Sequence, residues 1–239
     1  LYGGERSLLD LLKAFESLDF NVVVTLPSAL NRDYVELLRT HSLGVGIIPD
    51  GWWQLGKLPC VDTIRHFQNL FERFKVDVVH VNTLVQDNIL VAASQAGIKL
   101  VVHVRELLTQ DPALCAALNA SPAQGYYHVS EVADLILANS QCMYNSLTAS
   151  IVQQSSLQTL PSPPIIATPN TIDMSTLVSL PAIDDRSSNK ICVAMLSSNI
   201  AKKGIWDFVD VAIKLNDFAD LVGFKLFGPK TAEIEQIID

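Results

Sequence analysis

A β-branched run that ends in polar residues is the feature that most constrains this chain: Leu100-Val101-Val102-His103-Val104-Arg105-Glu106. Runs of this kind, separated by helical segments, are typical of parallel strands that helices cover on both faces. In open parallel sheets, ligands bind beyond the carboxyl ends of the strands. The sequence therefore predicts that His103, Arg105 and Glu106 lie at the functional edge of a parallel sheet.

Other apolar runs of strand length follow the same plan. They occupy residues 21–26, 45–48, 76–81, 135–138 and 165–167 and alternate with amphipathic segments of helical period. This alternation predicts an α/β fold, a doubly wound, Rossmann-like parallel sheet with right-handed crossovers. The helical segment 63–74 has one apolar face, which indicates a core face made of Ile64, Phe67, Leu70, Phe71 and Phe74.

A polar stretch rich in serine divides this pattern. We predict an N-terminal Rossmann-like domain over residues 1–174, a linker over 175–189, and the first part of a second Rossmann-like domain over 190–239. Such a short second segment is marginal as an independent domain. We therefore expect it to pack against the first domain or to be part of a longer domain. Its expected strands and core-facing residues are 191–195, 223–227, Trp206, Val209 and Ile213. Because the chain opens directly with a helix, we also expect a fragment without its first strand.

Two features of the first domain have alternative interpretations. Residues 107–130 contain two prolines and a glycine, and we interpret them as an irregular, mobile connector. The alternative is a recognition loop, since long loops beyond strand ends often carry binding residues, here Tyr126, Tyr127 and His128. His80 lies inside an apolar run, which favours a hydrogen-bonded core histidine over a ligand.

Composition excludes several classes of function. The net charge is -8, which argues against a general nucleic-acid binder because that role needs a basic field. The four cysteines are scattered and match no metal-ligand spacing, so we expect no metal and free, reduced thiols in a cytoplasmic protein. No apolar run reaches the length of a membrane span, so we expect no membrane span, and we expect no signal peptide.

Paired glycines stand at the start of the first amphipathic segment. Gly3 and Gly4 would let backbone N–H groups approach an anion, which the helix dipole also favours. A plain glycine-rich helix start explains the pair equally well. Ser7 and Asp10 match a capping box, which would place the helix start later.

Seven short motifs in order resemble those of retaining glycosyltransferases of the GT-B fold, in the family 4-like group. In this family two Rossmann domains face each other across a cleft, the first binding mainly acceptor and the second binding the nucleotide-sugar donor. The motifs cover nearly the whole chain: Gly3-Gly4-Glu5-Arg6, Asp77-Val78-Val79-His80-Val81-Asn82, His103-Val104-Arg105-Glu106, Ala133 to Ser140, Pro169-Asn170-Thr171-Ile172-Asp173, Lys202-Lys203-Gly204 and Phe227-Gly228-Pro229.

The resemblance implies a role for each matching residue. Backbone N–H groups of Gly3 and Gly4 would face the donor phosphates, and His103 would hydrogen-bond the transferred sugar. Lys203 would neutralise the diphosphate leaving group. It also implies that neither a metal nor a cofactor is needed. The residues expected to shape the cleft are Arg105, Glu106, Asn139 and Asn170, with the first two as an ion pair.

Two departures from the family pattern concern the donor side. An arginine about five residues before the lysine is absent, because that region reads Met195-Leu196-Ser197-Ser198-Asn199. Ser198 or Asn199 would then hydrogen-bond a phosphate without supplying charge. The family's Glu-x7-Glu segment, which holds the donor sugar and ribose, would lie beyond Asp239.

The leading hypothesis is sugar transfer from a nucleotide sugar to a hydroxyl of a glycan or lipid-linked acceptor, in the synthesis of a cell-surface glycan or polysaccharide. That role would place the protein in the cytoplasm and would allow peripheral association with the inner face of the membrane. Two alternatives stay open: a non-catalytic binding subunit of the same fold, and a nucleotide-sugar epimerase. For His103 the alternative is a strand-end histidine that caps a backbone group, and for Lys203 a solvated helix start.

Overall fold

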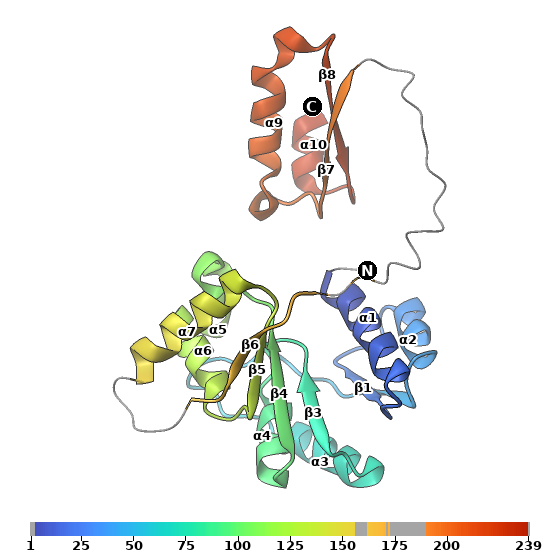
Figure 1. Ribbon diagram of the computed structural model, residues 1–239, viewed down its shortest axis with the longest axis vertical. Coiled ribbons are helices and arrows are strands. Elements are labelled where there is room, and N and C mark those ends of the chain that lie inside the picture. Colours follow the sequence, from blue (N-terminus) through green and yellow to red (C-terminus); the bar gives the residue numbers. More distant parts are fainter. Residues whose placement is uncertain (1–2, 156–161, 171, 173–189, 239) are drawn as a thin grey trace. The chain divides into compact units, whose positions relative to one another are not determined.

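The computed structural model describes residues 3–155, 162–170, 172 and 190–238. The chain forms two compact units, Leu1–Leu177 and Val178–Asp239. The predicted linker, residues 175–189, lies outside the described residues, so the domain boundaries of the sequence analysis stay a prediction. Each unit is an α/β structure with parallel strands (Figure 1), which confirms the predicted fold class.

The first unit contains two parallel sheets and not one continuous sheet. The strand order is β1-β2 in one sheet and β3-β4-β5-β6 in the other. The strands are β1 (Val23–Leu26), β2 (Gly44–Ile47), β3 (Val78–Val81), β4 (Lys99–Val104), β5 (Leu135–Ala138) and β6 (Ile165–Ala167). The α-helices are α1 (Gly3–Ser17), α2 (Arg32–Arg39), α3 (Val61–Phe74), α4 (Asn88–Ala96), α5 (Pro112–Leu118), α6 (Pro122–Ser130) and α7 (Gln141–Ser155).

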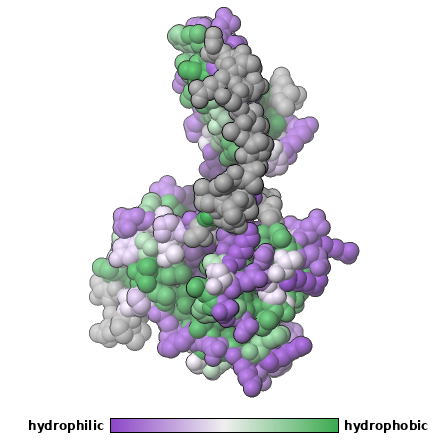
Figure 2. Space-filling view, turned by 45° about the vertical axis from the view of Figure 1, so that its right-hand side comes forward, coloured by the Kyte–Doolittle hydropathy of each residue, from purple (hydrophilic) through white to green (hydrophobic). Residues whose placement is uncertain are grey.

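Apolar periodicity explains how these elements pack. Helix α4 packs on β3 and β4, and α7 packs on β5 and β6. The larger core lies around the four-stranded sheet and includes Ile64, Phe67 and Phe71 of α3, as predicted, although Phe74 is 40% exposed. A smaller core joins α1, β1 and α2. On the face that Figure 2 shows, hydrophobic and hydrophilic residues are intermixed.

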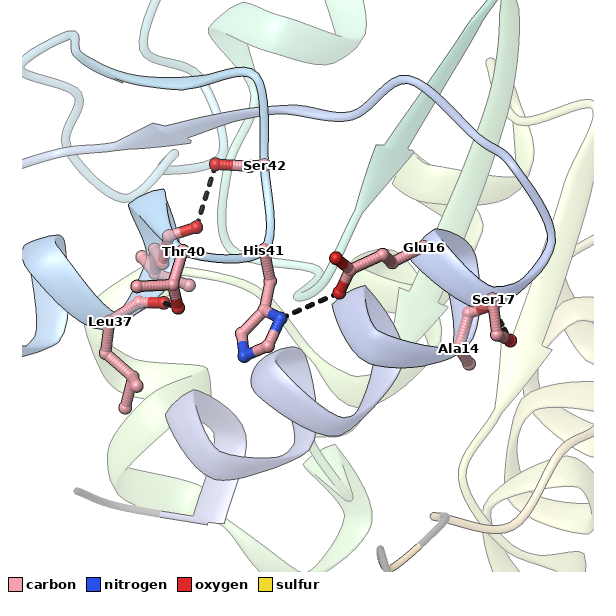
Figure 3. A network of polar contacts seen from close by, with 8 residues as sticks. Ala14, Glu16, Ser17, Leu37, Thr40, His41 and Ser42 are labelled. Atoms are coloured by element: carbon pink, nitrogen blue, oxygen red, sulfur yellow. Dashed lines mark hydrogen bonds and ion pairs between the residues drawn. The ribbon is translucent and has the colours of Figure 1, made fainter.

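Local signals set the helix ends. Gly97 ends α4 with φ +66, a left-handed conformation that glycine adopts without a Cβ clash. Ser140 Oγ accepts a hydrogen bond from Met143 N at 3.1 Å, so Ser140 is the predicted N-cap of α7. Helix α1 begins at Gly3 and not at the later capping box. Its last turn is joined to the turn that follows α2 through Glu16 Oε2 and His41 Nδ1, which lie 2.8 Å apart (Figure 3).

The prediction of an irregular connector over 107–130 is wrong. This segment contains the 3-10 helix η1 (Leu108–Gln110) followed by α5 and α6. Both prolines occupy the first helical turn, where the missing N–H costs nothing, and Asp111 and Ser121 are the N-caps. The prolines therefore start helices here, although the sequence analysis treated them as breaks.

The second unit begins with β7 (Ile191–Leu196) and pairs it in parallel with β8 (Val222–Phe227). Between them lie η2 (Ala201–Lys203), α9 (Ile205–Lys214) and η3 (Asn216–Phe218), and α10 (Ala232–Ile238) follows β8. The predicted strands are confirmed, but the predicted core face of α9 is wrong in part. Trp206 and Ile213 are 41% and 67% exposed, while Ile205 is fully buried. The helical phase begins one residue earlier than the sequence analysis placed it.

Candidate functional site

Polar residues lie beyond the carboxyl end of each strand of the four-stranded sheet. Asn82 comes directly after β3, Arg105 directly after β4 and Asn139 directly after β5. Asn170 follows β6 after two residues. Because the strands are parallel, their carboxyl ends share one edge, which is the edge that the sequence analysis predicted to be functional.

The Arg105 guanidinium connects several of these strand ends. Its Nε donates to Asn82 Oδ1 at 2.8 Å, and its Nη1 donates to Asn170 Oδ1 at 2.7 Å. Its third nitrogen, Nη2, lies 3.3 Å from His103 Nδ1. Asn139 is half-buried and takes no part in these described contacts. We call Asn82, His103, Arg105 and Asn170 the strand-end network.

The start of α1 contacts this network. Asn82 Nδ2 donates to the Gly4 carbonyl at 3.5 Å, and Ser7 Oγ donates to Asn170 Oδ1 at 3.4 Å. Gly3 and Gly4 are exposed in the first turn of the helix, where backbone N–H groups have no intrahelical acceptor. The start of α1, where the sequence analysis predicts an anion site, and the strand-end network therefore lie together in the first unit.

His103 is buried in the described structure, with 5% of its surface exposed. Burial and, secondarily, the Arg105 charge lower its pKa to about 3. The same two causes lower the pKa of His80, whose ring stacks on His103 at 5.8 Å, to about 4. Both imidazoles are therefore neutral at pH 7. The resemblance implies that His103 hydrogen-bonds the transferred sugar, and this contact stays a prediction. It requires that the sugar reach a side chain that is buried in the described structure.

His80 differs in one respect from its predicted role. It packs inside the first unit, with its ring between Phe15 and His103. Its Nε2 atom is buried and has no hydrogen-bond partner among the described residues, so the hydrogen bond expected for a core histidine is not made at that atom.

Glu106 organises the turn that follows β4. Its carboxylate accepts hydrogen bonds from Thr83 Oγ1 at 2.5 Å, Leu84 N at 3.2 Å and Arg105 N at 3.1 Å. The predicted ion pair between the Arg105 and Glu106 side chains is wrong, because within the described part of the chain each bonds to other groups. Glu106 thus joins the turns after β3 and β4 through backbone N–H groups.

We expect Glu106→Ala to lower the free energy of unfolding of the first unit by about 2–3 kcal/mol, because two part-buried backbone donors lose their acceptor. Glu106→Gln is the matched control, since its Oε1 can accept from both N–H groups while its Nε2 donates to Thr83 Oγ1. Denaturant unfolding of both variants measures the difference. Equal stabilities would contradict the role assigned to the carboxylate.

Helix α6 contacts this turn through Tyr126. Tyr126 is fully buried, its OH donates to the Glu106 carbonyl at 3.2 Å, and it accepts from Leu108 N at 2.8 Å. Tyr126 is therefore a structural residue and not the recognition residue of the alternative interpretation. His128 Nε2 lies 2.9 Å from Asp87 Oδ1, and the His128 ring stacks on Trp53 with 4.3 Å between the ring centroids.

In the second unit, Ser198 and Lys203 belong to the turn between β7 and α9. Lys203 is exposed at the end of η2, directly before Gly204 with φ +79, and Ser198 is half-buried. Asn199 cannot serve as the phosphate contact considered above, because only 2% of its surface is exposed. Its Nδ2 donates to the Pro229 carbonyl at 3.1 Å, its Oδ1 accepts from Ser197 Oγ at 3.1 Å, and its carbonyl accepts from Thr231 Oγ1 at 2.6 Å.

These bonds show what Asn199 does. It joins the turn after β7 to the turn after β8 through hydrogen bonds to Pro229 and Thr231. In the turn after β8, Gly228 lies close to the Ser197 carbonyl oxygen. A Cβ on Gly228 would lie 2.1 Å from the Ser197 carbonyl oxygen, so only glycine fits there. The shape of the turn that carries Ser198 and Lys203 therefore depends on a buried amide.

Metal-binding clusters and membrane-spanning helices are both absent from the described residues. No group of three or more His, Cys, Asp and Glu side chains in this part of the chain is arranged to hold a metal ion. None of the described helices has both the length and the apolar character needed to cross a bilayer.

The Glycosyl transferase 4-like domain matches residues 2–163 of the chain. This chain belongs to the glycosyl transferase 4-like family. The match spans the strand-end network except Asn170 and includes the start of α1. No curated protein sequence matches the chain.

Several solved structures share the fold of this chain at low sequence identity. Anabaena HepE in complex with UDP is 17% identical with a TM-score of 0.61, and 99% of this chain covers 68% of that one. S. aureus MnaA with UDP is 15% identical with a TM-score of 0.57, at coverages of 98% and 62%. Acinetobacter baumannii MurG is 12% identical with a TM-score of 0.52, at coverages of 98% and 65%. The chain thus spans about two thirds of each neighbour, and the likeness shows a GT-B type fold.

Asn82 accepts a hydrogen bond from Arg105 at the neighbouring strand end, and no sequence prediction gave it this role. Asn82 was quoted only as the last letter of a strand motif, although a polar residue directly after a buried strand was a usable signal. Ser7 and Asn199 carried no such signal, because their partners are remote in sequence.

Proposed function

We propose that this protein is a retaining glycosyltransferase that moves a sugar from a nucleotide sugar to a hydroxyl of a glycan or lipid-linked acceptor. The observation that carries the proposal is the strand-end network beside the start of α1, in a chain of the glycosyl transferase 4-like family. Backbone N–H groups of Gly3 and Gly4 would face the donor phosphates, and His103 would contact the sugar. Arg105, Glu106, Asn139 and Asn170 would shape the cleft.

The donor we propose is a uridine diphosphate sugar. HepE carries UDP in one solved structure and UDP-glucose in another, and MnaA carries UDP. Lys203 and Ser198 would bind the diphosphate from the second unit, with Lys203 as the only one of the two that supplies charge. We propose that these groups take the place of a metal and that no cofactor takes part.

We propose that the acceptor binds on the surface of the first unit. Leu30 and Leu58 are 93% and 88% exposed in the segments that follow β1 and β2. Exposed apolar side chains beyond the carboxyl ends of the β1-β2 sheet suit a lipid-linked acceptor and peripheral contact with a membrane at its cytoplasmic face.

The test uses the full chain with UDP-glucose as the first probe. We expect UDP to bind, and we expect transfer to a hydroxyl acceptor to give a product with the same anomeric configuration as the donor. Isothermal titration measures UDP binding, and NMR coupling constants of the new glycosidic bond report the anomer. An inverted anomer would refute retention, and absence of both UDP binding and transfer from a panel of nucleotide sugars would refute the proposal.

One alternative has a specific observation in its favour. Residues 195–199 contain no arginine at the donor turn, which suits a non-catalytic subunit that assembles with an active partner. Sugar transfer by the purified chain would eliminate it. Turnover of the nucleotide sugar without any acceptor would instead indicate an epimerase.

A further inference from the structure

The contact between Arg105 and His103 determines which ring nitrogen of His103 carries a proton. Arg105 Nη2 lies 3.3 Å from His103 Nδ1. A guanidinium has N–H donors only and no acceptor, and it stays protonated at any ordinary pH. Nδ1 must therefore be the acceptor of this hydrogen bond. In a neutral imidazole the proton then resides on Nε2.

The position of the guanidinium is determined by acceptors from two other strands. Its Nε and Nη1 donate to the amide oxygens of Asn82 and Asn170, so these two nitrogens are turned away from His103. Asn82 is itself oriented, because its Nδ2 donates to the Gly4 carbonyl at 3.5 Å. Ser7 Oγ donates to the same Asn170 oxygen at 3.4 Å. Arg105 is thus held by residues on both sides and points its remaining nitrogen at Nδ1.

The other ring nitrogen is in a different situation. His103 Nε2 is buried and has no hydrogen-bond partner among the described residues, and only 5% of the surface of His103 is exposed. An N–H at this atom is a donor that needs an acceptor, since an unpaired buried donor costs free energy. Any ligand group that reaches Nε2 must therefore accept a hydrogen bond.

We propose that Arg105 is a positioning residue that holds His103 as the neutral Nε2–H tautomer. His103 then offers a hydrogen-bond donor, and not a base, to a hydroxyl or carbonyl oxygen of a bound ligand. The role of His103 as a donor to a ligand rests on the proposed function, whereas the assignment of the tautomer does not.

The neighbours of the ring support a neutral His103. The Arg105 guanidinium contacts one side of the ring, so a second positive charge on the ring is disfavoured, and the buried His80 ring stacks on the ring at 5.8 Å between centroids. The direction of the His103 pKa shift agrees with this geometry, since burial and the Arg105 charge both lower it. A proton added at Nδ1 would also face the guanidinium and lose the hydrogen bond.

NMR of the full chain labelled with ¹⁵N-histidine tests the proposal directly. Long-range ¹H–¹⁵N correlation spectra at pH 7 distinguish a protonated from an unprotonated ring nitrogen, and His80→Gln and His103→Gln assign the two buried rings. We expect His103 Nδ1 to be unprotonated and Nε2 protonated in the unmodified chain. A protonated Nδ1 would overturn the proposal, and this measurement needs no Arg105 variant to fold.

Variants then test whether Arg105 sets the tautomer. In Arg105→Leu we expect signals of both tautomers or of the reversed one, whereas Arg105→Lys retains a donor and should keep most of the Nε2–H form. Arg39→Leu, on the exposed surface of α2, is the control and should leave the His103 signals unchanged. An unchanged tautomer in a folded Arg105→Leu variant would overturn the positioning role.

The two proposals fail separately. If the Nε2–H form is found and the full chain transfers no sugar, the proposed function fails and the role of Arg105 stands. If the chain transfers sugar and Nδ1 is protonated, only the role of Arg105 fails.

Discussion

Lys203→Ala is expected to lower kcat for sugar transfer by about 10²–10³-fold, because one fixed donor to a developing charge contributes about that much. The lysine is exposed at the end of η2, in the turn whose shape depends on Asn199 and Gly228. Its ammonium would meet the diphosphate as negative charge develops on it during bond cleavage. Steady-state kinetics with a uridine diphosphate sugar measure the loss.

Lys202→Ala is the matched control for this variant. It removes the same charge from the adjacent residue of the same 3-10 helix, so it reproduces any change in the general field of the second unit. We expect it to change kcat by less than tenfold, and we expect Lys203→Arg to recover part of the activity. Equal losses in Lys202→Ala and Lys203→Ala would refute a specific role for Lys203.

Acidification is expected to destabilise the first unit strongly through His80 and His103. An exposed imidazole has a pKa of about 6.5, whereas burial lowers that of His80 to about 4 and that of His103 to about 3. Between these values the unfolded chain binds more protons than the folded chain. The stabilisation from the neutral rings is therefore complete above about pH 6.5 and is lost as the pH falls toward the folded pKa values.

The magnitude follows from proton linkage. Each histidine lowers the free energy of unfolding by up to about 1.4 kcal/mol for each pH unit in this window. Denaturant unfolding at several pH values between 7 and 4.5 measures the slope. His80→Gln and His103→Gln should each reduce the slope, because a glutamine does not titrate. Comparison among variants cancels the contribution of carboxylates, which is common to all of them.

His66→Gln serves as the control for the acid experiment. His66 is exposed on α3, so His66→Gln replaces an imidazole outside the two cores. If all three variants gave the slope of the unmodified chain, the two buried imidazoles would not be the source of the acid sensitivity.

The sequence predicted the elements whose signals are local. The strands 135–138 and 165–167 have the observed bounds, because short apolar runs between polar turns read directly as buried parallel strands. Ser140 caps α7 and Gly97 ends α4, since caps depend on two or three neighbouring residues. The edge that carries His103 and Arg105 followed from the parallel order of the strands.

Local signals gave wrong predictions where the same residue type or spacing is compatible with two structures. Pro112 and Pro122 stand in first helical turns, and a proline in that place looks the same in sequence as a proline that ends a helix. Trp206 and Ile213 have the right spacing for a core face, yet burial depends on the phase in which the helix meets its sheet. The segment 107–130 and the face of α9 were therefore misassigned.

By itself, the sequence determined the parallel α/β plan, the family and the edge at which polar residues collect. Only the tertiary structure decided the partners of those residues. Arg105 bonds to Asn82 and Asn170, which are 23 and 65 residues away, while its neighbour Glu106 turns to Thr83 and to backbone N–H groups. The physical reason is that a charged side chain at a strand end takes the nearest acceptors in space, and those arrive from other strands whose register no local pattern encodes.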